Sequence, residues 1–123
     1  MAVVVDASAI GAIMFGEPEG RALAEHLDDQ TLLAPTLLDY EIANLAWKKV
    51  RRRPEQLPQI ALSLEATLSL PITRIAVPAA AAFALAATTG LTAYDASYLW
   101  LARSRDAELV TLDVELARMA AED

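Results

Sequence analysis

Four acidic side chains occupy positions that an ordinary surface role does not fully explain. Asp6 directly follows three consecutive valines in "VVVDASAI", and Asp113 ends the apolar stretch of "ELVTLDVELA". Glu41 interrupts an apolar helical stripe, because its neighbours at i−4, i−3 and i+4 are all leucines. Asp95 begins a very apolar segment, "YDASYLWLA". If these four carboxylates met at one place, they would bind a hard divalent cation, since such cations prefer oxygen ligands.

Each of these acids also has a purely structural explanation. Asp6 and Asp113 can each cap the helix predicted to follow them, and Thr92 with Asp95 fits a capping box. Glu41 could lie at the solvent edge of its stripe. Taken singly, Asp6 and Asp95 fit either role equally, a cap suffices for Asp113, and a functional role accounts better for Glu41.

The electrostatic cost of bringing the four acids together predicts a metal ion. At about 5 Å and an effective dielectric near 20, each ionised pair repels by ~3 kcal/mol. Six pairs would cost on the order of 20 kcal/mol, more than a whole domain's stability of roughly 5–15 kcal/mol. Either some acids stay protonated or a cation binds, and at neutral pH the cation is the simpler solution. Mg²⁺ or Mn²⁺ suits oxygen ligands, whereas zinc is disfavoured because the chain has no cysteine and His26 stands alone.

Alternating short strands and helices are expected to position these residues. This pattern predicts an α/β fold in one domain over residues 1–123, a three-layer α/β/α sandwich with a short central parallel sheet. Such sheets bind ligands at the carboxyl ends of their strands, where Asp6 falls. Thr36 and Asp39 fit a capping box for one helix. We expect strands at Val3–Val5, Leu32–Ala34, Ile72–Val77 and Glu108–Leu112, and helices at 7–14, 18–28, 37–52, 55–68, 79–88 (ended by Gly90), 93–104 and 114–121.

The composition suits a cytoplasmic protein. The 123 residues are 55% hydrophobic, enough for a sizeable core, and the absence of cysteine fits a reducing compartment. Met1 leads straight into the first strand without a basic segment, so we expect no secretory signal. The longest apolar run, Ile75–Ala87, contains Pro78 and is too short to cross a membrane, so we expect no membrane partner.

A basic segment stands out against the net charge of −7. That acidic balance alone argues against non-specific binding of nucleic acid. The segment "KKVRRR" nevertheless holds half of the ten basic residues, and it either completes a helix C-terminus or contacts phosphates. Bound Mg²⁺ activates water and stabilises charge on a phosphodiester, which reconciles an acidic chain with a nucleic-acid substrate. The candidate phosphate contacts are Lys48, Lys49, Arg51, Arg52 and Arg53.

The whole chain resembles the PIN-domain nucleases, and among them the VapC-type toxins of toxin–antitoxin pairs. The resemblance rests on "VVVDASAI", "APTLLDYEIANLAW", "LTAYDASYLWLA" and "LVTLDVELA", in this order and at these spacings. No single motif is specific, but the ordered set is. By this resemblance the catalytic and metal-binding acids are Asp6, Glu41, Asp95 and Asp113, and the supporting hydroxyl residues are Ser8 and Thr111.

The resemblance also implies an activity and partners. It implies a Mg²⁺- or Mn²⁺-dependent endoribonuclease that cleaves RNA phosphodiester bonds and leaves a 5′-phosphate and a 3′-hydroxyl. It implies a homodimer and a cognate antitoxin protein whose segment wraps the toxin and can reach the acidic site. Met14, Trp47 and Trp100 could contact that antitoxin, or they could simply belong to the core.

Other functions with similar folds fit less well. A receiver domain needs a late lysine, and no lysine follows Lys49; a haloacid-dehalogenase-like phosphatase needs a second Asp where Ser8 stands. A glycine-rich phosphate loop after the first strand is absent. A non-catalytic binding module of the same fold, which acts through a protein partner, stays open as the alternative.

Overall fold

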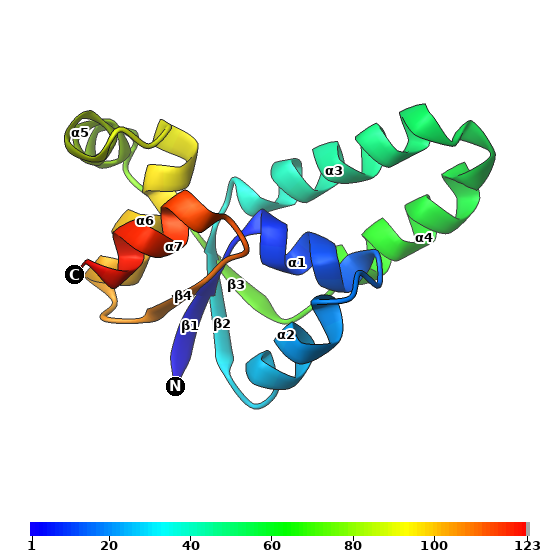
Figure 1. The fold of residues 1–123 in the computed structure, drawn as a ribbon, viewed down its shortest axis with the longest axis horizontal. Coiled ribbons are helices and arrows are strands. Elements are labelled where there is room, and N and C mark those ends of the chain that lie inside the picture. Colours follow the sequence, from blue (N-terminus) through cyan, green and yellow to red (C-terminus); the bar gives the residue numbers. More distant parts are fainter. Residues whose placement is uncertain (123) are drawn as a thin grey trace.

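A short parallel sheet forms the centre of the molecule (Figure 1). The computed structural model describes residues 1–122. Four strands lie in the order β3-β2-β1-β4, and every neighbouring pair is parallel. The strands are β1 (Ala2–Val5), β2 (Thr31–Pro35), β3 (Ile72–Ile75) and β4 (Glu108–Val110). The predicted parallel sheet is confirmed, and all four strands end at one edge.

Two strands are shorter than the sequence predicts. β3 ends at Ile75 rather than Val77, and β4 ends at Val110 rather than Leu112. Beyond β4 the Leu112 amide donates to the Ser8 hydroxyl at 2.9 Å rather than to a neighbouring strand. The residues just past β4 therefore belong to the site at the sheet edge, not to the sheet.

Helices cover both faces of the sheet, which confirms the three-layer α/β/α sandwich (Figure 1). One face carries the first four helices and the other face carries the last three. α3 and α4 form an antiparallel pair that extends away from the sheet (Figure 1). The helices are α1 (Ala7–Met14), α2 (Gly20–Leu27), α3 (Leu38–Arg52), α4 (Leu57–Leu68), α5 (Ala79–Thr89), α6 (Ala93–Ser104) and α7 (Val114–Ala121), with a 3₁₀ turn at Pro54–Gln56 before α4.

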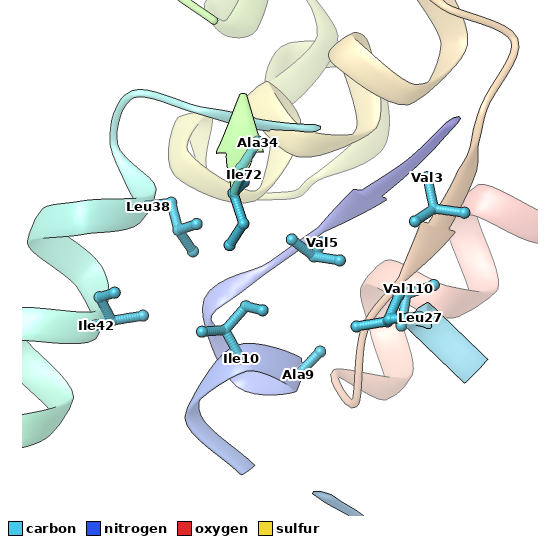
Figure 2. Close-up of a cluster of buried hydrophobic side chains, with 10 residues drawn as sticks. All are labelled: Val3, Val5, Ala9, Ile10, Leu27, Ala34, Leu38, Ile42, Ile72 and Val110. Atoms are coloured by element: carbon cyan, nitrogen blue, oxygen red, sulfur yellow. The ribbon is translucent and has the colours of Figure 1, made fainter. Parts of the chain in front are cut away.

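The run of three valines explains how β1 joins the two layers. Successive side chains of a strand point to opposite faces, so Val3 and Val5 enter one core and Val4 enters the other. The first core, between the sheet and α1–α4, appears in Figure 2, where strand side chains meet those of α1 and α3. All three valines are at most 2% exposed, as expected of a strand covered on both faces.

The second helix begins later than expected, at Gly20 rather than residue 18. A Cβ atom at Gly20 would lie 2.5 Å from the Ala12 carbonyl oxygen, so only glycine lets α2 start this close to α1. The helix end predicted at Gly90 is confirmed, since Gly90 caps the C-terminus of α5 with a positive φ of 80°.

The capping box predicted for Thr36 and Asp39 is wrong. α3 begins at Leu38, its N-cap is Leu37, and no side chain caps it. Asp39 instead accepts hydrogen bonds from the Arg74 guanidinium of β3 at 2.9 and 3.0 Å. A charged partner on the neighbouring element outcompetes the local cap, because charge-assisted bonds are the stronger ones.

No helix among the described residues combines the length and the apolar character that a membrane crossing requires.

Candidate active site

Asp6 lies at the carboxyl edge of the sheet, directly after the central strand β1 and beside the edge strand β4. Val5 of β1 pairs with Val110 of β4, so the next residues of the two strands, Asp6 and Thr111, are brought side by side. The Thr111 hydroxyl donates to one Asp6 carboxylate oxygen. The other oxygen accepts from the Ser8 hydroxyl at 2.7 Å and from the Ala9 amide at 3.0 Å. Strand register and helix capping together hold this carboxylate in place.

Asp6 is both a helix cap and a buried acid. Its bond from the Ala9 amide caps α1, so the capping interpretation is confirmed. It is only 5% exposed, and desolvation raises the pKa of its carboxyl above the ordinary value, although the hydrogen bonds from Thr111, Ala9 and Ser8 act in the opposite direction. A cap needs no such burial, so capping does not account for the whole environment of this side chain.

Ser8 and Thr111, the two hydroxyl residues that the resemblance implies as supports, both donate hydrogen bonds to Asp6. Their hydroxyl oxygens lie 3.3 Å apart. Ser8 also accepts from the Leu112 amide at 2.9 Å, and Thr111 accepts from the Asp113 amide at 3.0 Å. These bonds link the chain after β4 to the start of α1.

Glu41 receives a hydrogen bond from a residue that the sequence analysis did not select. The buried Tyr98 hydroxyl of α6 donates to Glu41 Oε1 at 2.6 Å. Desolvation raises the pKa of Glu41, this hydrogen bond lowers it, and the charges of Asp95 and Asp6 raise it again. The bond joins α3, on one face of the sheet, to α6, on the other.

Asp95 and Asp113 both take part in helix starts. The Thr92 hydroxyl caps α6 by accepting from the Asp95 amide at 3.1 Å, and Asp113 caps α7 by accepting from the Leu116 amide at 2.9 Å. The pKa of Asp95 is raised, first by desolvation and then by the charges of Asp113 and Asp6. The cap uses the Asp95 amide and not its carboxylate, and the charges of Asp113 and Asp6 act on that carboxylate.

The four acids interact electrostatically although they are not packed together. Asp113 raises the pKa of Asp6, and the other mutual effects link Asp6, Glu41, Asp95 and Asp113 into one set. Among residues 1–122, however, no three Asp, Glu, His or Cys side chains are arranged so that they could hold a metal ion. The side chains as they stand therefore form a shared acidic edge rather than a preassembled metal centre.

A pocket of about 360 Å³ adjoins this acidic edge. Ser8 and Glu41 line it together with Lys48, so it connects the acids to the basic segment. A second hollow, of about 310 Å³, is lined by Ser8 and by Lys48, Lys49 and Arg52. The first residue of the basic segment, Lys48, therefore lines both hollows.

The basic residues line two hollows and also contact aromatic rings. Lys48, Lys49 and Arg52 line the second hollow, and Lys48, Arg51 and Arg52 line a third, basic hollow. Lys49 also lies 4.6 Å from the centre of the Phe15 ring, and the Arg51 guanidinium lies 4.8 Å from that of Trp47. Three of the five occupy the last turn of α3, so the helix-terminus interpretation also holds. Arg53 follows the helix as its C-cap and lines none of these hollows.

The three residues considered for an antitoxin contact differ in how far the structure exposes them. Met14 and Trp100 are partly buried against the two cores, whereas Trp47 is 52% exposed. His26 lies at the surface, where its Nε2 is 3.1 Å from the Glu108 carboxylate.

Tyr98 is the residue that sequence reasoning missed. It was counted as part of an apolar helix, and 57 positions separate it from Glu41. One signal was present, because Tyr98 stands three residues after Asp95 and therefore on the same side of α6.

Comparison with known proteins supports a family assignment. Residues 3–122 match the model of the PIN domain family. The chain is 38% identical to Ribonuclease VapC3 of Pyrobaculum aerophilum over 125 aligned residues, covering 95% of this chain and 93% of that protein. It also resembles the crystal structure of PAE2754 from Pyrobaculum aerophilum, with a TM-score of 0.75 and 32% identity over 96% of this chain and 86% of that one. The chain therefore belongs to the PIN domain family and is similar within it to a VapC-type ribonuclease.

Proposed function

We propose that this protein is a divalent-metal-dependent endoribonuclease, the toxin of a toxin–antitoxin pair. The observation that carries the proposal is the set of four mutually interacting acids at the carboxyl edge of a PIN-domain sheet. The relative named Ribonuclease VapC3 supports the choice of RNA as substrate. The proposed site residues are Asp6, Glu41, Asp95 and Asp113, with Ser8 and Thr111 in support.

The donor chemistry of the site suits Mg²⁺ or Mn²⁺. The acids offer carboxylate oxygens, and the two side chains that are hydrogen-bonded to Asp6 add hydroxyls. Desolvation and mutual repulsion raise the pKa of Asp6, Glu41 and Asp95, and a cation would relieve that repulsion. Without one, like charges favour conformations in which the carboxylates stand apart. When bound, the ion would lower the pKa of a water and offset charge on the phosphodiester.

The chain's own residues perform the positioning in this proposal. Asp6 is oriented by three hydrogen bonds, which favour its ionised form against the cost of burial. Tyr98 holds Glu41 toward the shared edge. Lys48 and Arg52, which line hollows further along α3, attract the phosphates that follow the scissile one.

The proposal extends to partners and compartment. The family resemblance supports a homodimer and an antitoxin protein that blocks the acidic edge, both acting in the cytoplasm where RNA is available. The half-exposed Trp47 is one apolar group available for such a contact.

The alternative is a binding module of the same fold without turnover. Sequencing of RNA 5′ ends separates the two functions. Total RNA would be incubated with the purified protein in Mg²⁺, in Mn²⁺ and in chelator, with the Asp6→Asn protein prepared identically. We expect discrete new 5′ ends that require the metal and disappear with Asp6→Asn.

A second variant guards against simple misfolding of Asp6→Asn. Asp95→Asn changes a half-exposed acid with no role in capping through its own carboxylate. We expect it to lose the same 5′ ends while both variants unfold cooperatively. Identical 5′ ends with the parent and both variants would overturn the nuclease assignment in favour of the binding module.

A further inference from the structure

Two exposed tyrosines line the pocket beside the acidic edge. Tyr40 of α3 is 81% exposed and Tyr94 of α6 is 64% exposed, and both contribute to the 360 Å³ pocket that Glu41 and Ser8 also line. They come from helices on opposite faces of the sheet. Neither belongs to a hydrophobic core, so folding does not account for placing two aromatic rings there.

All three tyrosines of the chain are gathered around Glu41. Tyr98 is buried and donates its hydroxyl to the Glu41 carboxylate. Tyr40 and Tyr94 leave their rings largely in solvent within the same pocket. An exposed aromatic face next to an acidic site offers a stacking surface for a planar ligand.

We infer that this pocket binds a nucleobase of single-stranded RNA, next to the phosphodiester that is cleaved. The inference rests on the proposed function: if the acidic edge receives a phosphodiester, an attached nucleotide must occupy the adjoining space. Tyr40 and Tyr94 supply the stacking surfaces, and Asn44 on the same wall supplies an amide for the base edge. A base within a duplex is already stacked on both faces, so the pocket selects unpaired RNA.

The charges along α3 favour RNA over a protein segment as the occupant. Lys48 lines the pocket, the second hollow and the basic hollow beyond it, and it has no ion-pair or hydrogen-bond partner within residues 1–122. Ser8 and Leu45 are shared by the first two of these hollows. A strand whose base enters the pocket can therefore place its next phosphates on Lys48 and Arg52, in a protein whose net charge is otherwise −7.

The test measures RNA binding by fluorescence anisotropy in the Asp6→Asn background, so that RNA is bound but not cut. The probes are a pool of single-stranded 20-mer RNAs of defined sequences, the same RNAs annealed to their complements, and a 20-mer ribose-phosphate chain without bases. The variants are Tyr40→Ala/Tyr94→Ala and Tyr40→Phe/Tyr94→Phe. Phe83→Ala, which removes a 70% exposed aromatic ring from α5, is the matched control.

We expect the double alanine variant to bind the single-stranded pool at least about tenfold more weakly, because a stacked ring contributes about fivefold to a hundredfold per base. The double phenylalanine variant keeps the ring faces and should bind within about twofold of the parent. The baseless chain should bind weakly and equally to all variants, and Phe83→Ala should match the parent. Thermal unfolding should be nearly unchanged, because both rings are exposed.

Three outcomes would overturn the inference. One is equal affinity of the two double variants for the single-stranded pool, which would show that the rings do not stack on bases and would favour a protein segment as the occupant of the pocket. Another is an equal loss with the baseless chain, and the third is no binding by the parent. The 5′-end sequencing tests the nuclease function separately. Metal-dependent cleavage by a protein whose RNA affinity does not depend on the two tyrosines would overturn the base-binding inference and leave the proposed function intact.

Discussion

Single residues at the sheet edge each serve structure and the candidate chemistry at once. Asp6 caps α1 and is also the buried carboxylate that Ser8 and Thr111 surround. The capping and functional interpretations that the sequence left open are therefore not alternatives here. A cap uses one lone pair of a carboxylate that has several, so the same side chain can face the edge.

Tyr98→Phe tests whether the hydroxyl positions Glu41. The change removes the 2.6 Å bond and no ring volume, and Glu41 loses its hydrogen-bond partner among the described residues. Removing a group that orients a metal ligand typically weakens metal binding by about 10–100-fold. We expect that loss in Mn²⁺ affinity, measured by calorimetry, with a stability loss of about 1 kcal/mol.

Ser97→Ala is the control for Tyr98→Phe. Ser97 is the preceding residue of α6, also buried, and its hydroxyl donates to the Tyr94 carbonyl rather than to an acid. Its removal should cost similar stability and leave Mn²⁺ affinity unchanged. Equal Mn²⁺ affinity of Tyr98→Phe and the parent would show that the Tyr98 bond is structural only.

At the scale of elements, α3 connects the acidic site to the basic segment. Glu41, Leu45, Lys48 and Arg52 recur every three or four residues, so they share one side of the helix. That side faces α1, since Leu45 lies close to Gly11, where an added Cβ would be 2.9 Å from the leucine side chain. From Glu41 to Arg52 the helix rises about 16 Å, which spaces the phosphate contacts away from the acids.

Lys48→Gln and Arg52→Gln should lower the salt dependence of RNA binding. In single strands each lost phosphate contact reduces the slope of log K against log salt by about 0.7. We expect a reduction of about 1.4 for the double variant, measured with the single-stranded pool in the Asp6→Asn background. Arg105→Gln makes a matched change at an exposed position just before β4, at the opposite end of the strands, and should leave the slope unchanged. An unchanged slope in the double variant would remove these residues from the RNA path.

At the scale of the whole molecule, acidic repulsion makes stability depend on pH and on cations. The pKa of Asp95 is raised in the folded state by desolvation and by Asp113 and Asp6. A raised pKa means that the folded state holds its proton more tightly than the unfolded state does. Stability from this group is thus fully present below the unfolded-state pKa of about 4, and it is lost as pH rises through the folded-state pKa.

Asp95→Asn tests this linkage through thermal unfolding between pH 3 and pH 8. Without divalent cations, the parent and the variant should have similar Tm values at pH 3, and the variant should be more stable by a few degrees at pH 7. Added Mg²⁺ should raise the Tm of the parent at pH 7 and raise that of Asp95→Asn less. A parent that is the more stable protein at pH 7 without cations would show that the mutual repulsion is negligible.

The sequence alone was enough to predict the elements and to form a hypothesis about their chemistry. Periodicity, capping residues and Gly90 located the strands and helices, because these signals are local in the chain. The four acids could be singled out because a buried strand or an apolar stripe makes a carboxylate conspicuous. The PIN resemblance followed from their order, and the family match confirmed it.

Only the tertiary structure decided which distant residues meet. The Arg74–Asp39 pair replaced a predicted capping box, and Tyr98 reached Glu41 across the molecule. The strand register brought Thr111 against Asp6, and the packing of α1 on α3 opened the pocket where Tyr40 lies. These contacts depend on how separate elements pack, and a local pattern carries no information about the partner that a side chain finds on another element.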